Sequence, residues 1–258
     1  MADDIDGRAV VTIRVGTSGW QYADWRGLFY PPKLAQRNWL THYATTFDTV
    51  EVNATFYRLP SQSAVQKWAD TLPDGFVMAV KASRYLTHVK RLVEPDEPVA
   101  RLMDRISPLR QRGALGPVLV QLPPHFPVAA ERLDQTLRAF DRRVPIAVEL
   151  RDMSWFNDEI KSVLTTHNAA LVWADRDGRS VGPLWTTATW RYLRLHHGRS
   201  GWGYDRADLR RWAHRMGEVE DGYVYANNDP GAAAVQDASR IRDLLHSRRR
   251  SEQFIPAP

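Results

Sequence analysis

Carboxylate side chains alternate with branched apolar side chains in two segments of this 258-residue chain. Glu51 lies between Val50 and Val52 in TVEVNATFYRLP, and Glu149 has a similar setting in VELRDMSW. Successive residues of a β-strand point to opposite faces, so the valines predict one apolar face and the glutamates the other. Two inward carboxylates could serve as general acid and general base, provided that their surroundings move their pKa values apart.

The same alternation places further polar side chains on the inward face of other predicted strands. The inward set comprises Glu51, Asn53, Lys81, Gln121, Glu149, Arg151, Arg194, His196 and Asn227. Three members are cations; arginine holds carboxylate or phosphate groups bidentately, and lysine acts as a point charge. The set therefore predicts a site for a small anionic molecule. His196 ends its strand and could be a general base or a contact of the anion.

Two other roles stay open for these residues. Each glutamate could be paired with Lys81, Arg151 or Arg194, in which case the set would be a buried ion network that fills the interior. Lys81 could also form a Schiff base with a carbonyl substrate if it is desolvated.

A divalent metal site is a further alternative. Its candidate ligands would be Glu51, Glu149, Asp175 and His196. These residue types do bind such ions in some barrels. The chain has no HExxH motif and no acidic metal-binding loop, and the three cations would repel a metal. We therefore assign no metal ligand and no cofactor from the sequence.

Aromatic residues follow several of the predicted strands, where the loops of a barrel mouth would lie. Trp20, Tyr57 and Trp155 are candidates for ligand contacts, because aromatic rings stack on sugars, bases and other rings. Packing beneath a long loop is the alternative for each of them. Phe56 and Tyr57 together are expected to rim the mouth.

These side chains need elements that position them, and short β-branched segments do alternate with longer amphipathic ones, as is typical of βα units. The predicted strands are Thr12–Thr17, Thr49–Thr55, Phe76–Ala82, Pro117–Leu122, Ile146–Arg151, Ala170–Asp175, Arg191–His196 and Tyr223–Asn228. The predicted helices are Ala35–Thr45, Ser61–Thr71, Val99–Arg112, Val128–Phe140, Asn157–Thr166, Arg206–Met216 and Ala232–Ser247. This α/β pattern predicts a single-domain TIM (β/α)8 barrel over residues 1–247.

Two features depart from a regular barrel. The segment between Asp175 and Thr189 is too short and broken for a full helix, so the sixth βα unit is expected to be irregular. Three arginines at 248–250 open a basic segment, residues 248–258, which we expect to be a solvated, flexible tail.

The composition limits the class of protein further. A net charge of +5 permits anionic ligands without requiring nucleic acid, and the absence of cysteine excludes disulfides and thiolate chemistry. The acidic start, MADDIDGRAV, lacks the apolar core of a secretory signal. No apolar run approaches the roughly 18 residues of a membrane span. We therefore expect a cytoplasmic protein without membrane contact; its oligomeric state is not predicted.

Seven motifs occur in order and at the spacing of barrel strands. They are VGTSGWQYADWRGLFYPP, VEVNATFYRLPS, FVMAVKAS, LVQLPPHF, VELRDMSW, YLRLHHGR and VYANND. Together they resemble the YecE-like family, also called domain of unknown function 72, from about Arg14 to Ala238. The resemblance implies a TIM barrel and supplies no established reaction. It highlights Gly16, Thr17, Gly19, Trp20, Glu51, Asn53, Phe56, Tyr57, Lys81, Gln121, Leu122, Pro123, Glu149, Arg151, Trp155, Arg194, His196, Asn227 and Asn228.

Two positions depart from the family pattern. His197 adds a second histidine where the pattern has a shorter His-Gly, and Ala226 stands where a bulky aromatic residue is more usual. The first leaves two candidates for the histidine of this motif. The second implies a larger space near Asn227.

The sequence thus favours an enzyme, a hydrolase, lyase or isomerase, that acts on a small anionic or phosphorylated molecule of sugar- or nucleotide-like character. Proton transfer would fall to Glu51, Glu149 or His196. One alternative is a metal-dependent nuclease, which rests on fold analogy and predicts a basic stripe leading to a metal cluster. Another is a non-catalytic module that binds an anion without turnover.

Overall fold

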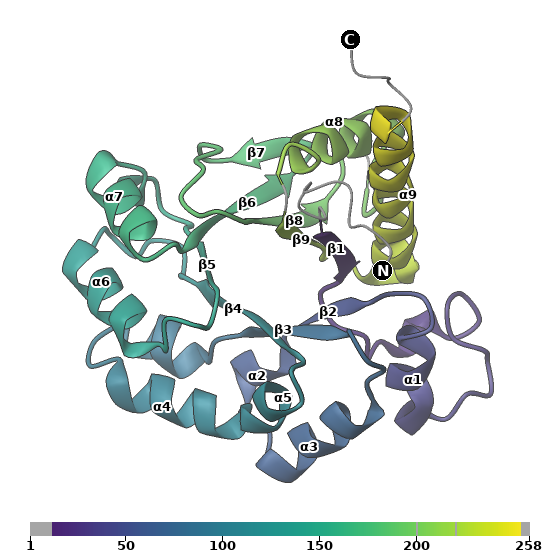
Figure 1. The fold of residues 1–258 in the computed structure, drawn as a ribbon, viewed down its shortest axis with the longest axis horizontal. Helices are drawn as coiled ribbons and strands as arrows, with labels where there is room; N and C mark the ends of the chain where they lie inside the picture. Colours follow the sequence, from purple (N-terminus) through teal and green to yellow (C-terminus); the bar gives the residue numbers. More distant parts are fainter. Residues whose placement is uncertain (1–11, 200, 220, 254–258) are drawn as a thin grey trace, which may run out of the picture.

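The computed structural model describes residues 12–199, 201–219 and 221–253. Eight parallel strands form a ring around a central axis, and helices surround the ring (Figure 1). The ring strands are β1 (Thr12–Thr17), β2 (Thr49–Val52), β3 (Val77–Lys81), β4 (Leu115–Gln121), β5 (Ile146–Glu149), β6 (Ala170–Arg176), β8 (Arg191–His197) and β9 (Asp221–Ala226). The TIM-like barrel predicted from the sequence is confirmed.

Hydrogen-bonded neighbours in the ring follow the order β1-β9-β8-β6-β5-β4-β3-β2. The register sets Gln121 beside Glu149, and Arg194 beside Tyr225. Because neighbouring parallel strands run in step, polar residues near their carboxyl ends reach similar heights along the axis. The interior polar side chains therefore gather at one end of the barrel.

The ring closes between β1 and β2 through a side chain as well as the backbone. One isolated bridge joins Ser18 to Glu51. The Tyr43 hydroxyl accepts a hydrogen bond from the Thr17 amide at 2.9 Å and donates one to the Thr49 carbonyl at 3.1 Å. Tyr43 thus takes the place of direct bonds between the two strands and satisfies backbone groups that would otherwise be buried unpaired.

Gly16 permits the close approach of β1 and β2. A Cβ at this position would lie 2.1 Å from the Thr49 carbonyl oxygen, closer than any two such atoms can come. Any residue other than glycine would push the strands apart, which gives the Gly16 in the first motif a packing role.

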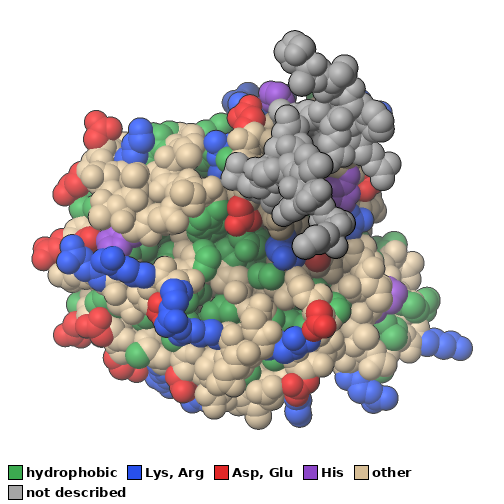
Figure 2. Space-filling model, viewed as in Figure 1, with side chains coloured by type: hydrophobic (Ala, Val, Ile, Leu, Met, Phe, Trp, Pro, Cys, Tyr) green, Lys and Arg blue, Asp and Glu red, His purple; other side chains and the backbone are tan. Residues whose placement is uncertain are grey.

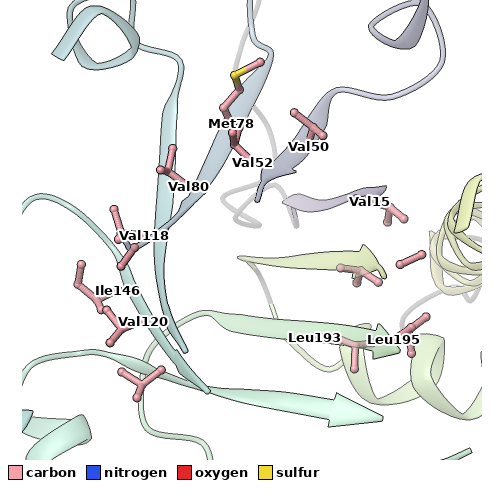
Figure 3. Close-up of a cluster of buried hydrophobic side chains, with 14 of the residues drawn as sticks. Val15, Val50, Val52, Met78, Val80, Val118, Val120, Ile146, Leu193 and Leu195 are labelled. Atoms are coloured by element: carbon pink, nitrogen blue, oxygen red, sulfur yellow. The ribbon is translucent and has the colours of Figure 1, made fainter. Parts of the chain in front are cut away.

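The outer face of the ring carries the main hydrophobic core. Val50, Val52, Val80, Leu193 and Leu195 are buried there between strands and helices. Figure 3 shows these side chains on the outer side of the strands. Burying each one contributes roughly 1.5–3 kcal/mol relative to exposure. The predicted alternation in β2, β3 and β8 matches this arrangement.

A second, smaller apolar cluster fills the axis below the polar residues. Small side chains on one side of the ring, among them Ala79 and Ala147, meet large ones on the other, among them Tyr192 and Tyr225. Layers of complementary size keep the interior packed, so the barrel is a core and not a pore.

The helices are α1 (Trp39–Tyr43), α2 (Ala54–Tyr57), α3 (Gln62–Thr71), α4 (Asp96–Arg105), α5 (Ser107–Gln111), α6 (Ala130–Ala139), α7 (Asp158–Thr166), α8 (Arg206–Met216) and α9 (Ala233–Gln253). Short turns η1 (Ala23–Trp25), η2 (Gln36–Asn38), η3 (Tyr85–Val89), η4 (Met153–Trp155) and η5 (Pro230–Ala232) lie between them. The helix predicted over Val99–Arg112 is two helices, because Pro108 cannot continue the first helix and lies in the first turn of the second.

Several other boundaries differ from prediction. The strand expected over Thr49–Thr55 ends at Val52, because the chain turns at Asn53 into α2. The helix expected over Ala35–Thr45 is reduced to η2 and α1. The last helix was expected to end at Ser247 before a tail, yet α9 continues to Gln253. No glycine or proline interrupts residues 248–253, so nothing in the sequence ends the helix there. Residues 254–258 of the expected tail lie outside the described residues.

The sixth βα unit is irregular, as predicted. Strand β7 (Arg179–Val181) folds back antiparallel on β6 in place of a helix. The Thr187 hydroxyl then accepts from the Leu171 amide at 2.8 Å and donates to the Ala169 carbonyl at 2.7 Å, which fastens the return segment to the ring.

The face in Figure 2 has hydrophobic atoms near its centre and charged side chains of both signs interspersed around its rim. None of the helices in the described part of the chain is long and apolar enough to cross a membrane.

Candidate active site

Arg194 of β8 lies between the two inward glutamates. Its guanidinium donates to Glu51 Oε1 at 2.8 Å and to Glu149 Oε2 at 2.5 Å, and all three side chains are buried. One planar cation thus fixes carboxylates from β2 and β5 on opposite parts of the ring. The arrangement is the ion network that the sequence left open as an alternative, at least for these three residues.

Both carboxylate oxygens of Glu51 are occupied. Besides Arg194, Glu51 accepts from the Ser18 hydroxyl at 2.6 Å and from the Tyr192 hydroxyl at 2.6 Å. Three donors leave this carboxylate well satisfied and rigid. Glu51 therefore fits the role of a structural partner of Arg194 better than the role of a proton carrier.

Glu149 is held as an anion by its neighbours. Gln121 donates to it at 2.8 Å, and Arg151 Nε donates at 3.0 Å. Burial alone would raise the pKa of Glu149, but Arg194, His196 and Arg151 together hold it well below its usual range. A carboxylate that stays ionised in this way is a poor proton donor near neutral pH.

Lys81 differs from the other cations of the site. Its ammonium lies 4.1 Å from the centre of the Phe56 ring, and no hydrogen bond or ion pair within the described residues engages its Nζ. The side chain is 9% exposed. Burial, with Arg194 adding to the effect, lowers the pKa of Lys81 to about 8. It is a nearly buried amine that changes charge close to neutral pH.

His88 of η3 packs beside the same ring. Its imidazole meets Phe56 edge to face at 4.9 Å and contacts the Thr87 hydroxyl at 2.9 Å. Burial, followed by the nearby charges of Lys81 and Arg151, lowers the pKa of His88 to about 4. The ring is therefore neutral and adds no charge beside Lys81.

His196 stands between Asn227 and Glu149. Its Nδ1 lies 2.9 Å from the Asn227 amide nitrogen, and its Nε2 lies 3.5 Å from Glu149 Oε1, too far for a good hydrogen bond. Burial lowers the pKa of His196 against the opposing effect of Glu149, so the ring is neutral near pH 7. With Asn227 donating to Nδ1, the proton sits on Nε2 and faces the carboxylate.

Asp229 is a site residue that the strand pattern did not reveal. It follows β9 at the start of η5, and its backbone carbonyl accepts from the Trp25 indole at 2.8 Å. Its Oδ1 is buried without a hydrogen-bond partner. Burial raises the pKa of Asp229 to about 7, and Glu51 adds to the increase, whereas the Tyr22 hydroxyl opposes it. The VYANND motif ends on this residue, which was the available signal.

Partnerless buried polar atoms gather at this end of the barrel. They are Asn53 Oδ1, Arg194 Nε, His196 Nε2, Asn228 Oδ1 and Asp229 Oδ1. Buried polar groups in proteins are almost always satisfied by protein, water or ligand. A polar molecule at the mouth would supply the missing partners.

Other predicted contacts lie away from this cluster. Trp155 is completely buried and donates its indole N–H to the Phe126 carbonyl, and Trp20 packs edge to face on Trp68 at 5.5 Å. Tyr57 is 81% exposed and lies on the rim. The packing alternative therefore describes the two tryptophans, while Tyr57 is open to a ligand.

The candidate metal set does not form. Asp175 points outward from β6, where it accepts from the Tyr204 hydroxyl at 2.8 Å and from the Trp212 indole at 2.7 Å. The guanidinium of Arg194 occupies the space between Glu51 and Glu149. Within the described residues, no group of three or more histidine, aspartate or glutamate side chains could hold a metal ion. These donors thus do not fit a divalent cation.

One curated relative matches most of the chain, and another matches less than half of it. The UPF0759 protein YunF of Bacillus subtilis is 26% identical over 270 aligned residues, which cover 90% of this chain and 94% of YunF. The UPF0759 protein YecE of Escherichia coli is 31% identical over 114 residues, 44% of this chain and 39% of YecE.

Solved structures share the barrel. A DUF72 family protein from Thermotoga maritima superposes with a TM-score of 0.81 at 27% identity and covers 91% of this chain and 99% of that one. SacUVDE superposes with a TM-score of 0.57 at 9% identity over 92% of this chain and 99% of its own, a likeness of fold alone.

The family model described as protein of unknown function DUF72 matches residues 14–258. The chain therefore belongs to the DUF72 family, as its motifs indicated.

Proposed function

We propose that this chain is an enzyme that acts on a small anionic molecule held at the carboxyl-terminal mouth of the barrel, by hydrolysis, elimination or isomerisation. The observation that carries the proposal is Lys81, a nearly buried ammonium without an acidic partner in the described residues. A buried charge is costly unless it is paired, so an anionic ligand would stabilise the site.

The charges around Lys81 support an anion. Glu51 and Glu149 carry two negative charges, which Arg194 and Arg151 offset in direct ion pairs. His196 and His88 are neutral because burial lowers the pKa of both. Lys81 therefore adds an excess positive charge to a low-dielectric interior, where it attracts a carboxylate or phosphate strongly.

Proton transfer in this proposal belongs to Lys81 and Asp229. Burial lowers the pKa of Lys81 to about 8 and raises that of Asp229 to about 7, and catalysis of proton transfer is most efficient when the pKa lies near the working pH. Glu51 and Glu149 hold Arg194, and His196 is a third candidate because its Nε2 lacks a hydrogen bond.

Native mass spectrometry of the purified protein, followed by metal analysis, tests this proposal. We expect a co-purified or added phosphorylated or carboxylated metabolite to remain bound to the wild type and to be lost from Lys81→Met. Lys67→Met is the matched control, because Lys67 is exposed on α3. Equal retention by both variants would overturn the role of Lys81.

Turnover separates the enzyme from a binding module. An enzyme should convert the retained ligand at a rate that Asp229→Asn lowers by about 100-fold or more, the usual contribution of a proton-transfer group. Binding without conversion by the wild type would instead establish a non-catalytic module. The alternative of a metal-dependent nuclease is weaker, because no group of carboxylate and histidine side chains in the described residues could hold a metal ion.

A further inference from the structure

A basic groove lies beside the mouth, between α2, η3 and α4. Its volume is about 440 Å³. Residues that matter to its chemistry are Phe56, Tyr57, Arg58, Arg84, Tyr85 and Arg101. Helices α2 and α4 lie on the same side of the ring in Figure 1.

The residues that line the groove carry an excess of positive charge. No aspartate or glutamate is among the described residues that line it. Arg101 approaches Glu97 only at 3.9 Å, and the side chains of Arg58 and Arg84 make no ion pair with the described residues. Three arginines thus line one hollow, and arginine is the residue that binds phosphate bidentately.

Two aromatic rings in the groove are open to solvent. Tyr57 is 81% exposed and Tyr85 is 49% exposed. Phe56 supports the first ring edge to face at 5.0 Å, so Tyr57 is braced without being covered. Exposed aromatic rings beside cations are the arrangement on which nucleic-acid bases stack.

One wall separates the groove from the mouth. Phe56 lines the groove and also contacts the Lys81 ammonium at 4.1 Å. The Thr55 hydroxyl donates to the Lys81 carbonyl at 2.7 Å, which fixes α2 against β3. A ligand in the groove would therefore lie directly beside the axial site.

We infer that this groove binds a nucleoside phosphate, with the phosphate on Arg58, Arg84 and Arg101 and the base on Tyr57 or Tyr85. The source could be a free nucleotide or the end of a single strand, since both present the same group. This inference goes beyond the proposed function and stands on different residues.

Calorimetric titration with AMP, adenosine, ribose 5-phosphate and inorganic phosphate tests the inference. We expect AMP to bind more tightly than the other three. Arg84→Gln should weaken AMP binding about tenfold, and Tyr57→Ala about five- to a hundredfold, the range of a lost base stack. Arg142→Gln, an exposed arginine outside the groove, is the matched control.

The outcomes divide clearly. Equal affinity for AMP and inorganic phosphate, or equal AMP affinity in Arg84→Gln and Arg142→Gln, would overturn the inference. Tighter binding of a short oligothymidylate than of TMP would identify a strand as the source, and the reverse a free nucleotide. Lys81→Met should leave AMP binding intact. If this variant lost AMP binding, the nucleotide would bind in the mouth and not in the groove. That result would contradict this inference independently of the proposed function.

Discussion

The two cations Arg194 and Lys81 lie in one ring of polar side chains but in opposite electrostatic settings. Arg194 is enclosed by two glutamates at hydrogen-bond distance, whereas Lys81 faces an aromatic ring and has no acidic partner within the described residues. The first setting fixes geometry, and the second leaves a nearly buried charge without an ion pair. The difference shows that burial and charge do not by themselves distinguish a structural cation from one with capacity for a ligand; the pairing of its side chain does.

Removal of Arg194 should produce the largest effect on folding. Arg194→Met leaves two buried carboxylates without their shared cation, and breaking a buried pair in this way costs about 3–5 kcal/mol of unfolding free energy. Urea denaturation measures the loss, with Arg142→Met as the control. A loss below about 1 kcal/mol would mean that Arg194 is no more structural than Lys81.

Removal of Lys81 should instead change how stability depends on pH. Its pKa is about 8 in the folded chain against about 10.5 unfolded, so the unfolded chain binds more protons between these values. The wild type should therefore gain on the order of 3 kcal/mol relative to Lys81→Met as the pH rises from 8 to 10.5. Parallel pH curves for the two proteins would show that Lys81 is paired after all.

Asp229 provides the opposite slope at lower pH. Its pKa rises from 3.8 in the unfolded chain to about 7 in the folded one, so its contribution to stability is complete below the lower value and is lost as the pH passes the upper one. Relative to Asp229→Asn, the wild type should lose on the order of 2 kcal/mol of unfolding free energy between pH 4 and 7. This is less than the full pKa shift would give, because Asp229 is partly exposed and solvent screens its charge. Thermal unfolding across this range would detect it, and a flat difference would refute the shift.

Removal of Gln121 should cause the smallest loss of stability, and it tests which partner of Glu149 matters most. Gln121→Leu removes one of the donors to Glu149 while Arg151 and Arg194 remain. We expect a loss of about 1 kcal/mol and no change in ligand retention at Lys81. A loss as large as that of Arg194→Met would contradict the view that the guanidinium dominates.

Strand alternation predicted most of the interior correctly, and it did so because β2, β5 and β8 are half apolar and half polar. The same rule could not orient Asp175, since ALVWAD is apolar on both faces and gives no contrast. The structure points it outward to Trp212.

Residues further along the loops could not be predicted by that rule. Asp229 reaches the site because η5 turns the chain back and the Trp25 indole holds its carbonyl, contacts that span 204 positions. The contrast between Arg194 and Lys81 was equally hidden, because pairing depends on side-chain distances that no local pattern encodes.

The join between β1 and β2 has a consequence for motion. Proteins open first where few backbone hydrogen bonds must break. Between β1 and β2, the Tyr43 hydroxyl and one backbone bridge replace the regular hydrogen bonds of a strand pair. Glu51 belongs to that bridge and also holds Arg194. A transient separation of these two strands would therefore also disturb the ion pair between Glu51 and Arg194.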